Sequence, residues 1–259
     1  MKLEVITHEP ATERKPRPLL FVHGAWHGAW CWNEHFLPYF AEHGYEVHAP
    51  SLRGHGESEI DGSLRVARMR DYVADVVSVA ESLSAPPVLI GHSMGGLVVQ
   101  MYLEDHSAAG GVLLASVPIR GVLGTTLRIA KRHPGAFLKA NLIWNLYPIV
   151  ATPELAREAF FTESMSDELV ATYHRQLQAE SYLGYLDMMF RLPKPERVKA
   201  PMLVMGAERD AIFTPAEVAA TAAAYGTEPV MMPDMGHDMM LESGWQDVAD
   251  RILKWLRDE

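Results

Sequence analysis

Hydrophobic and polar positions along this chain alternate between short apolar runs and longer amphipathic stretches. The short runs are bounded by turn-forming residues and have the length of buried strands. They predict strands at residues 3–7, 19–23, 46–50, 88–91, 111–116, 202–205 and 229–232. Apolar residues at helical spacing predict helices at residues 33–43, 66–82, 95–106, 215–225 and 246–257. Strands that alternate with helices indicate crossover connections, so the sequence predicts an α/β fold with a mostly parallel sheet flanked by helices.

One long segment interrupts this alternation. Residues 119–195 carry only helical patterns, separated by prolines and glycines. We expect this segment to form a helical cap subdomain, inserted into a core made of residues 1–118 and 196–259. The cap is rich in aromatic and aliphatic residues, which indicates an apolar pocket between cap and core. The candidates for its lining are Trp26, Trp144, Phe160 and Met239.

Composition narrows the possible partners and locations. The chain of 259 residues has a formal net charge of -10, which argues against a nucleic-acid partner because phosphate binding needs clustered cations. No apolar run reaches the roughly 18 residues of a membrane span, and the charged N-terminus does not resemble a signal peptide. The single cysteine, Cys31, excludes an internal disulfide and lies in a segment that is typical of a packed helix. We therefore expect a cytoplasmic protein without stable membrane insertion; the oligomeric state is not indicated.

The strongest candidate for chemistry is Ser93. The segment Gly91-His92-Ser93-Met94-Gly95 follows a predicted strand and leads into a predicted helix. A G-x-S-x-G motif in this strand-turn-helix context is typical of a nucleophile elbow, where the serine lies at the apex of a tight turn. The two glycines allow the strand and the helix to approach each other closely. The sequence therefore predicts that Ser93 is a catalytic nucleophile.

A serine hydroxyl is a weak nucleophile and needs a base that a third group orients. His237 is the only histidine after residue 174, and it follows the last predicted strand. Asp210 lies in the turn after the preceding strand, with Glu208 and Asp234 as neighbouring alternatives. The chain order Ser93, Asp210, His237 is the order expected for this architecture.

The transition state of acyl transfer also needs N–H donors for its oxyanion. One is expected from Met94, directly after the nucleophile, and the other from Ala25, with Trp26 as second choice. His23 and His27 are spaced like a metal pair, but they lie in a glycine turn without an H-E-x-x-H pattern. We therefore expect neither a metal nor another cofactor.

Together these motifs resemble the α/β-hydrolase superfamily over essentially the whole chain. Residues 21–30 look like the plant methylesterase and hydroxynitrile lyase branch and like related bacterial esterases. The lyases carry threonine at the position of Gly24 and lysine at that of Asp238, so these departures favour hydrolysis. Dehalogenases and epoxide hydrolases of this fold carry aspartate at the position of Ser93. The resemblance implies a cap after the sixth strand of the standard arrangement, while the short N-terminus leaves the usual second strand open.

The sequence thus predicts a cofactor-free serine hydrolase that cleaves a small-molecule carboxylic ester with an apolar acyl or alcohol group through an acyl-enzyme. Thioesterase, lactonase and C–C bond hydrolase chemistry uses the same triad, and these activities remain alternatives. A ligand sensor with slow turnover on the same fold is a further alternative from a different functional class.

Overall fold

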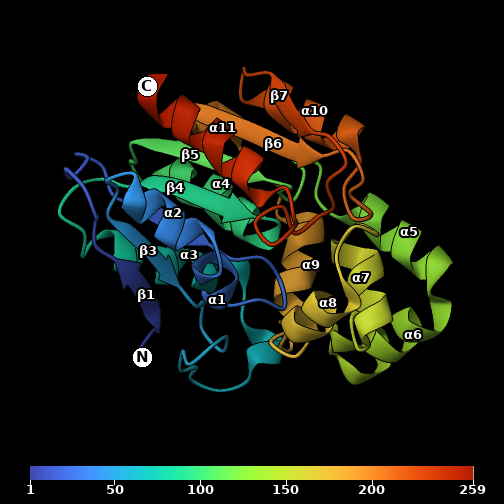
Figure 1. The fold of residues 1–259 in the computed structure, drawn as a ribbon. Helices are drawn as coiled ribbons and strands as arrows, with labels where there is room; N and C mark the ends of the chain where they lie inside the picture. Colours follow the sequence, from blue (N-terminus) through green and yellow to red (C-terminus); the bar gives the residue numbers. More distant parts are fainter. Residues whose placement is uncertain (259) are drawn as a thin grey trace.

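A seven-stranded sheet forms the centre of the molecule in the computed structural model, which describes residues 1–258 (Figure 1). Its spatial order is β1-β3-β2-β4-β5-β6-β7. β1 pairs antiparallel with β3, and every other pair of neighbours is parallel. The strands are β1 (Val5–His8), β2 (Leu19–Val22), β3 (Val47–Pro50), β4 (Val88–His92), β5 (Gly110–Leu114), β6 (Met202–Ala207) and β7 (Pro229–Met232).

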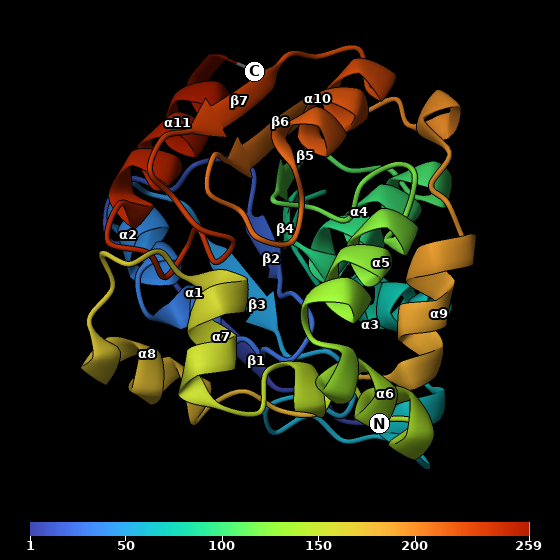
Figure 2. The ribbon, with the colours of Figure 1, turned by 90° about the vertical axis from the view of Figure 1, so that its right-hand side faces the viewer.

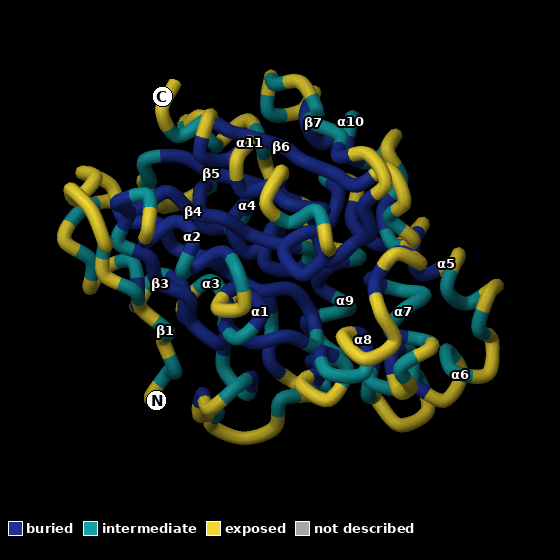
Figure 3. The backbone as a smooth tube through the Cα atoms, viewed as in Figure 1, coloured by how far each residue is buried: buried dark blue, intermediate teal, exposed yellow. Residues whose placement is uncertain are grey.

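Helices cover both faces of this sheet (Figure 2). On one face lie α1 (Trp30–Asn33), α2 (Phe36–Glu42) and α11 (Trp245–Asp258); on the other lie α3 (Met69–Ala80), α4 (Met94–Asp105) and α10 (Pro215–Ala224). Strand β2 shows why both faces are apolar, because Leu19 and Phe21 belong to one buried cluster while Leu20 and Val22 belong to the other. Successive side chains of a strand point to opposite faces, so a central strand between two helical layers is apolar throughout. The buried strands stand out in Figure 3.

The expected α/β fold is confirmed, with small differences at element ends. The helix expected at residues 33–43 begins only at Phe36, because the backbone is not helical at His35, and a separate short helix, α1, precedes it. The helix expected at residues 66–82 begins only at Met69, since Arg68 is extended and precedes it as N-cap. A single strand, β1, precedes Leu19, so the described chain has no second N-terminal strand. No helix among residues 1–258 has both the length and the apolar character of a membrane span.

Only helices and loops lie between β5 and β6, and in Figure 1 they group at one end of the sheet. The α-helices are α5 (Leu123–Arg132), α6 (Pro134–Ile143), α7 (Pro153–Phe160), α8 (Asp167–His174) and α9 (Tyr182–Phe190). The described chain also contains three short 3-10 helices, η1 (Leu64–Val66) before α3, and η2 (Tyr147–Ile149) and η3 (Pro195–Arg197) between β5 and β6. The boundaries of a separate cap subdomain at residues 119–195 stay a prediction.

The contact between α4 and β2 leaves no room for a side chain at Gly95. A Cβ atom there would lie 2.2 Å from the carbonyl oxygen of Val22 and 2.4 Å from that of His23. Such distances are far below van der Waals contact, and the obstructing atoms are backbone. The glycine is therefore required for the close packing of this turn.

Replacing Gly95 by alanine is expected to lower the free energy of unfolding by at least about 3 kcal/mol, because the helix must move away from the sheet. Gly135→Ala is the matched control, since Gly135 lies in α6 with no atom near the added Cβ. That substitution is expected to stabilise the chain by about 0.5 kcal/mol, through helix propensity and a less flexible unfolded state. Urea unfolding of both variants measures the difference; an unchanged midpoint for Gly95→Ala contradicts the packing argument.

Candidate active site

Ser93 lies at the tip of the sharp turn between β4 and α4. Its backbone angles, φ 52° and ψ −117°, are strained for a residue with a side chain, and such strain typically costs about 1–3 kcal/mol. Neighbouring backbone holds the turn: the Ser93 amide donates to Leu114, and its carbonyl accepts from Gly96 and Val117. Backbone strain that the surrounding structure enforces in this way is typical of a positioned functional residue.

A second pair of side chains comes from the loops after β6 and β7. Nδ1 of His237 lies 2.8 Å from Oδ2 of Asp210, and both side chains are buried. The other carboxylate oxygen of Asp210 accepts hydrogen bonds from the amides of Ile212 and Phe213, at 2.7 and 3.0 Å. Asp210 is thus fixed in place, and it orients the imidazole so that Nε2 is the free nitrogen.

The two alternatives to Asp210 lie elsewhere. Asp234 forms an ion pair with Arg209 at the surface, 2.5 Å between the nearest atoms, and Glu208 is exposed. Neither forms a hydrogen bond with His237 within the described chain. Among the three acidic residues, the geometry therefore favours Asp210.

Ser93 and His237 line one cavity together with Ala25 and Met94. Within residues 1–258, however, the structure contains no hydrogen bond between the Ser93 hydroxyl and Nε2 of His237. Such catalytic hydrogen bonds are often long or poorly aligned until substrate binds. The structure brings the predicted groups to one place, and the direct contact between serine and histidine stays a prediction.

The amides of Ala25 and Met94 are the free donors at this cavity. No acceptor for either amide is present among residues 1–258, whereas the Trp26 amide lies 3.4 Å from a carboxylate oxygen of Glu180. Ala25 is therefore favoured over Trp26 as the second oxyanion donor. Gly24 allows this loop to approach the serine turn, since a Cβ atom there would lie 2.8 Å from Nδ1 of His92 and 3.1 Å from Cβ of Ser93.

The cavity at Ser93 is narrow, with a volume of about 60 Å³, and nearly all of its surface is apolar. Residues of the core and of the inserted helices line it: Trp26, Val117, Val122, Ile129, Phe137, Leu146, Ile149, Met188, Ile212 and Phe213. Three of these residues, Ile129, Ile149 and Ile212, also line an adjoining groove of about 470 Å³. The small space at the serine and the larger groove therefore share part of their lining.

Of the four residues predicted to line the pocket, only Trp26 does so. Phe160 and Met239 are buried outside the cavity, where the Phe160 ring packs against Trp26 and His237. Trp144 is 53% exposed and stacks on Tyr182. The prediction that Trp144, Phe160 and Met239 line the pocket is therefore corrected. The residue types alone do not show which way a side chain points. The helical phase of α5, which places Ile129 on the cavity side, is a signal that could have found that residue.

A buried ion pair lies directly behind the site. Nε2 of His27 lies 3.0 Å from Oδ2 of Asp238, and Nδ1 lies 2.8 Å from the carbonyl oxygen of Ala25. Burial opposes charge on both groups, yet the Asp238 carboxylate raises the pKa of His27, and His27 lowers the pKa of Asp238. The pair links the loop that contains Ala25 to the residue after His237.

His92 takes a different role. Its Nε2 donates to the carbonyl oxygen of His237, at 3.0 Å, while burial and the neighbouring His237 lower its pKa to about 3. A neutral imidazole in this position supports the His237 loop. Donor atoms of His92, His237 and Asp238 lie within 4.8 Å of one another, as in some metal sites. Since His92 binds a backbone carbonyl and Asp238 binds His27, we assign these groups to hydrogen bonding within the protein.

Asp238→Asn is expected to lower the free energy of unfolding by about 3–5 kcal/mol, because the charge of His27 remains buried without its partner. The raised pKa of His27 means that its contribution is complete below pH 6.5 and is lost as the pH rises through that raised value. The lowered pKa of Asp238 means that its contribution is present above pH 3.8 and is lost as the pH falls.

The difference in the free energy of unfolding between wild type and Asp238→Asn should thus be largest between pH 3.8 and 6.5, and it should shrink in alkaline solution. Denaturant unfolding at several pH values measures it. The charged and titratable groups around this pair are His92, His237, Cys31 and Glu180. A difference that is constant from acid to alkaline pH contradicts the ion-pair assignment.

Comparison with known proteins bears on the family and the fold of this chain. Residues 19–251 match a family described as the alpha/beta hydrolase family. The chain is 23% identical to Methylesterase 18 of Arabidopsis thaliana over 216 residues, which are 76% of this chain and 80% of that protein. It is 35% identical to a pyrethroid hydrolase of Sphingobium wenxiniae over 104 residues, 38% of this chain, and that match spans only 35% of the hydrolase. A thermophilic esterase from Thermogutta terrifontis has a similar fold, with a TM-score of 0.73 and 24% identity over 99% of this chain and 94% of that one.

Proposed function

This chain belongs to the alpha/beta hydrolase family, and we propose that it is a serine esterase for a small carboxylic ester with one apolar arm. The observation that carries the proposal is the arrangement around one cavity of Ser93, His237 and two free amides, with Asp210 hydrogen-bonded to the histidine. Each group has the chemical type that acyl transfer requires, and their presence at one cavity supports the proposal. The esterase and methylesterase relatives support the same class of reaction.

The proposed reaction begins when Oγ of Ser93 attacks the ester carbonyl carbon and its proton passes to Nε2 of His237. Asp210 stabilises the imidazolium that forms. The carbonyl oxygen becomes an oxyanion, which accepts hydrogen bonds from the amides of Ala25 and Met94. Removal of one such donor typically costs about 2.7–4 kcal/mol of transition-state stabilisation.

Collapse of this intermediate breaks the bond to the alcohol, which leaves with the proton of His237. The acyl group is then bound to Ser93 as an ester. His237 next takes a proton from water as the water oxygen attacks the acyl carbon, which gives a second tetrahedral intermediate. When the bond from the acyl carbon to Oγ breaks, His237 returns the proton to Oγ, so the acid is released and Ser93 is restored. No step needs a metal or an organic cofactor.

The shape of the cavity supports an ester whose acyl and alcohol groups differ in size. The volume at the serine, about 60 Å³, is small, so one arm of the ester is short. We assign the other arm to the groove of about 470 Å³ that shares Ile129, Ile149 and Ile212 with this cavity. The apolar lining of the cavity at the serine favours a hydrocarbon or aromatic group there.

Two substrate series test this proposal. One varies the acyl group of p-nitrophenyl esters from acetate to palmitate; the other varies the alcohol of phenylacetate esters from methyl to octyl. We expect sustained turnover, with kcat/KM falling steeply with length in one series and little in the other. Absence of ester hydrolysis by folded protein contradicts the function, and equal tolerance of length in both series contradicts the proposed shape. Release of a single equivalent of product without turnover favours a ligand sensor.

A further inference from the structure

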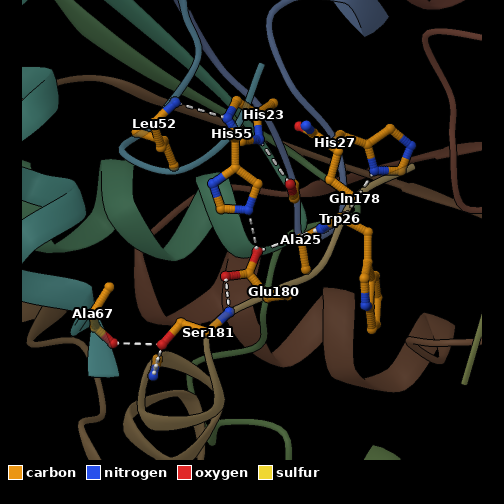
Figure 4. A network of polar contacts seen from close by, with 12 residues as sticks. His23, Ala25, Trp26, His27, Leu52, His55, Ala67, Gln178, Glu180 and Ser181 are labelled. Atoms are coloured by element: carbon orange, nitrogen blue, oxygen red, sulfur yellow. Dashed lines mark hydrogen bonds and ion pairs between the residues drawn. The ribbon is translucent and has the colours of Figure 1, made fainter. Parts of the chain in front are cut away.

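Glu180 lies on the loop between α8 and α9, within the inserted helical segment, yet its carboxylate is buried in the core (Figure 4). One oxygen accepts hydrogen bonds from the Tyr72 hydroxyl and the Ser181 amide, at 2.7 and 2.5 Å. The other oxygen lies 3.1 Å from Nε2 of His55 and 3.4 Å from the amide nitrogen of Trp26. Four donors thus converge on a carboxylate that the mechanism above does not use.

The partner of this carboxylate is the imidazole of His55. Nδ1 of His55 lies 3.2 Å from the carbonyl oxygen of Arg53, so both ring nitrogens of His55 face acceptors. Burial opposes the charge, but Glu180 raises the pKa of His55, and His55 lowers the pKa of Glu180. Both side chains are fully buried, so this contact is shielded from solvent.

The loop between α8 and α9 also binds the backbone of Trp26, at both its amide and its carbonyl group. Trp26 has φ 65°, a left-handed conformation that is unfavourable for a large side chain. Its amide faces Glu180, and its carbonyl oxygen accepts a hydrogen bond of 2.8 Å from the amide of Gln178. The side chain of Gln178 is itself fixed, because it accepts a hydrogen bond of 2.7 Å from Gly56.

The peptide between Ala25 and Trp26 is therefore held at both ends. Its carbonyl oxygen binds His27 and its N–H faces Glu180. This arrangement directs the Trp26 amide toward the buried carboxylate and leaves the Ala25 amide as the free donor of the loop. Rotation of the peptide would break both contacts and would alter the position of Ala25.

We propose that Glu180 is a positioning residue for the oxyanion loop, residues 23–27, which orients the Ala25 amide by binding the Trp26 amide and His55. The proposal rests on the esterase function proposed above. Glu180 belongs to the inserted helical segment. Its contacts with Trp26 and His55 therefore both hold this segment against the core and position the oxyanion loop.

Glu180→Gln tests the proposal, because glutamine keeps the size of the side chain and removes its charge. We expect kcat for a p-nitrophenyl ester to fall by about 100-fold, similar to the loss of an oxyanion donor, with KM changed less than about twofold. A trifluoromethyl ketone, which forms a tetrahedral oxyanion with a catalytic serine, should lose affinity in parallel with kcat/KM. A purely structural role of Glu180 does not produce that parallel.

Asp187→Asn is the matched control. Asp187 is a buried carboxylate on α9 that binds the side chain of Arg68 and the amide of Met69, so it also fastens the inserted segment to the core. It forms no hydrogen bond or ion pair with the oxyanion loop in the described structure. We expect Asp187→Asn to lower stability but to keep kcat and ketone affinity within about twofold of wild type at a temperature where both variants are folded.

Equal kcat in the two variants overturns the positioning role, provided that wild type hydrolyses the ester and Ser93→Ala does not. If wild type itself has no activity, the proposed function fails instead. If Glu180→Gln does not fold, the Tyr72→Phe variant tests the proposal instead, because it removes a single hydrogen-bond donor to Glu180. A loss in kcat of about threefold with unchanged KM supports the proposal, and unchanged kcat overturns it.

Discussion

Ser93→Ala is expected to lower kcat for p-nitrophenyl acetate by about 10⁴-fold or more, while the protein stays folded. The alanine removes the only atom that forms a bond to the substrate in the proposed mechanism. The backbone of the turn is held by hydrogen bonds to Leu114, Gly96 and Val117, none of which needs the hydroxyl. KM should therefore change little, and the urea midpoint should stay near that of wild type.

Ser116→Ala is the control for this substitution. Ser116 is also buried beside α4, and its hydroxyl accepts a hydrogen bond of 2.9 Å from Gln100, but it does not line the cavity. Loss of this hydroxyl is expected to lower the free energy of unfolding by about 1 kcal/mol and to lower kcat by less than about threefold. Activity of Ser93→Ala within tenfold of wild type contradicts a role of Ser93 as nucleophile.

Asp210→Asn is expected to lower kcat by about 10⁴-fold without unfolding the protein. Oδ1 of Asp210 accepts hydrogen bonds from two backbone amides, and Oδ2 accepts from Nδ1 of His237. An asparagine keeps its carbonyl oxygen toward the two amides, so its NH₂ group faces the histidine. That NH₂ group donates to Nδ1 and moves the imidazole proton to Nε2, where the nitrogen no longer accepts the proton of Ser93.

The neighbouring acidic residues provide the controls for Asp210. Asp234→Asn and Glu208→Gln are expected to keep kcat/KM within about twofold of wild type, because both side chains face solvent. Measurement of kcat/KM on one ester for all three variants is sufficient. A larger loss for Asp234→Asn than for Asp210→Asn contradicts the assignment of the acid.

The sheet and its helices could be predicted because the five inner strands, β2 to β6, are buried on both faces. Strands β2 and β4 are apolar over nearly their whole length, which a solvent-facing strand is not. The elbow was predictable for a related reason, since a serine between two glycines at the end of such a strand has few other uses. The placement of His237 and Asp210 followed from the rule that parallel strands end at one edge of the sheet.

The sequence did not predict Glu180. It lies in the segment Gln178-Ala179-Glu180-Ser181, whose polar character is typical of an exposed loop. Its partners Tyr72, His55 and Trp26 are separated from it by 108, 125 and 154 residues. A buried carboxylate is stable only if its partners are already in place, and those partners are set by tertiary structure. The pocket lining was missed for a similar reason, because the direction of each cap side chain depends on how its helix packs.

The most direct test of the central claim is mass spectrometry of the folded protein after reaction with a fluorophosphonate probe. The account predicts a single phosphonyl group on Ser93 in wild type and a strongly reduced rate of labelling in His237→Ala. Labelling at another residue, or none on folded wild-type protein, would contradict it.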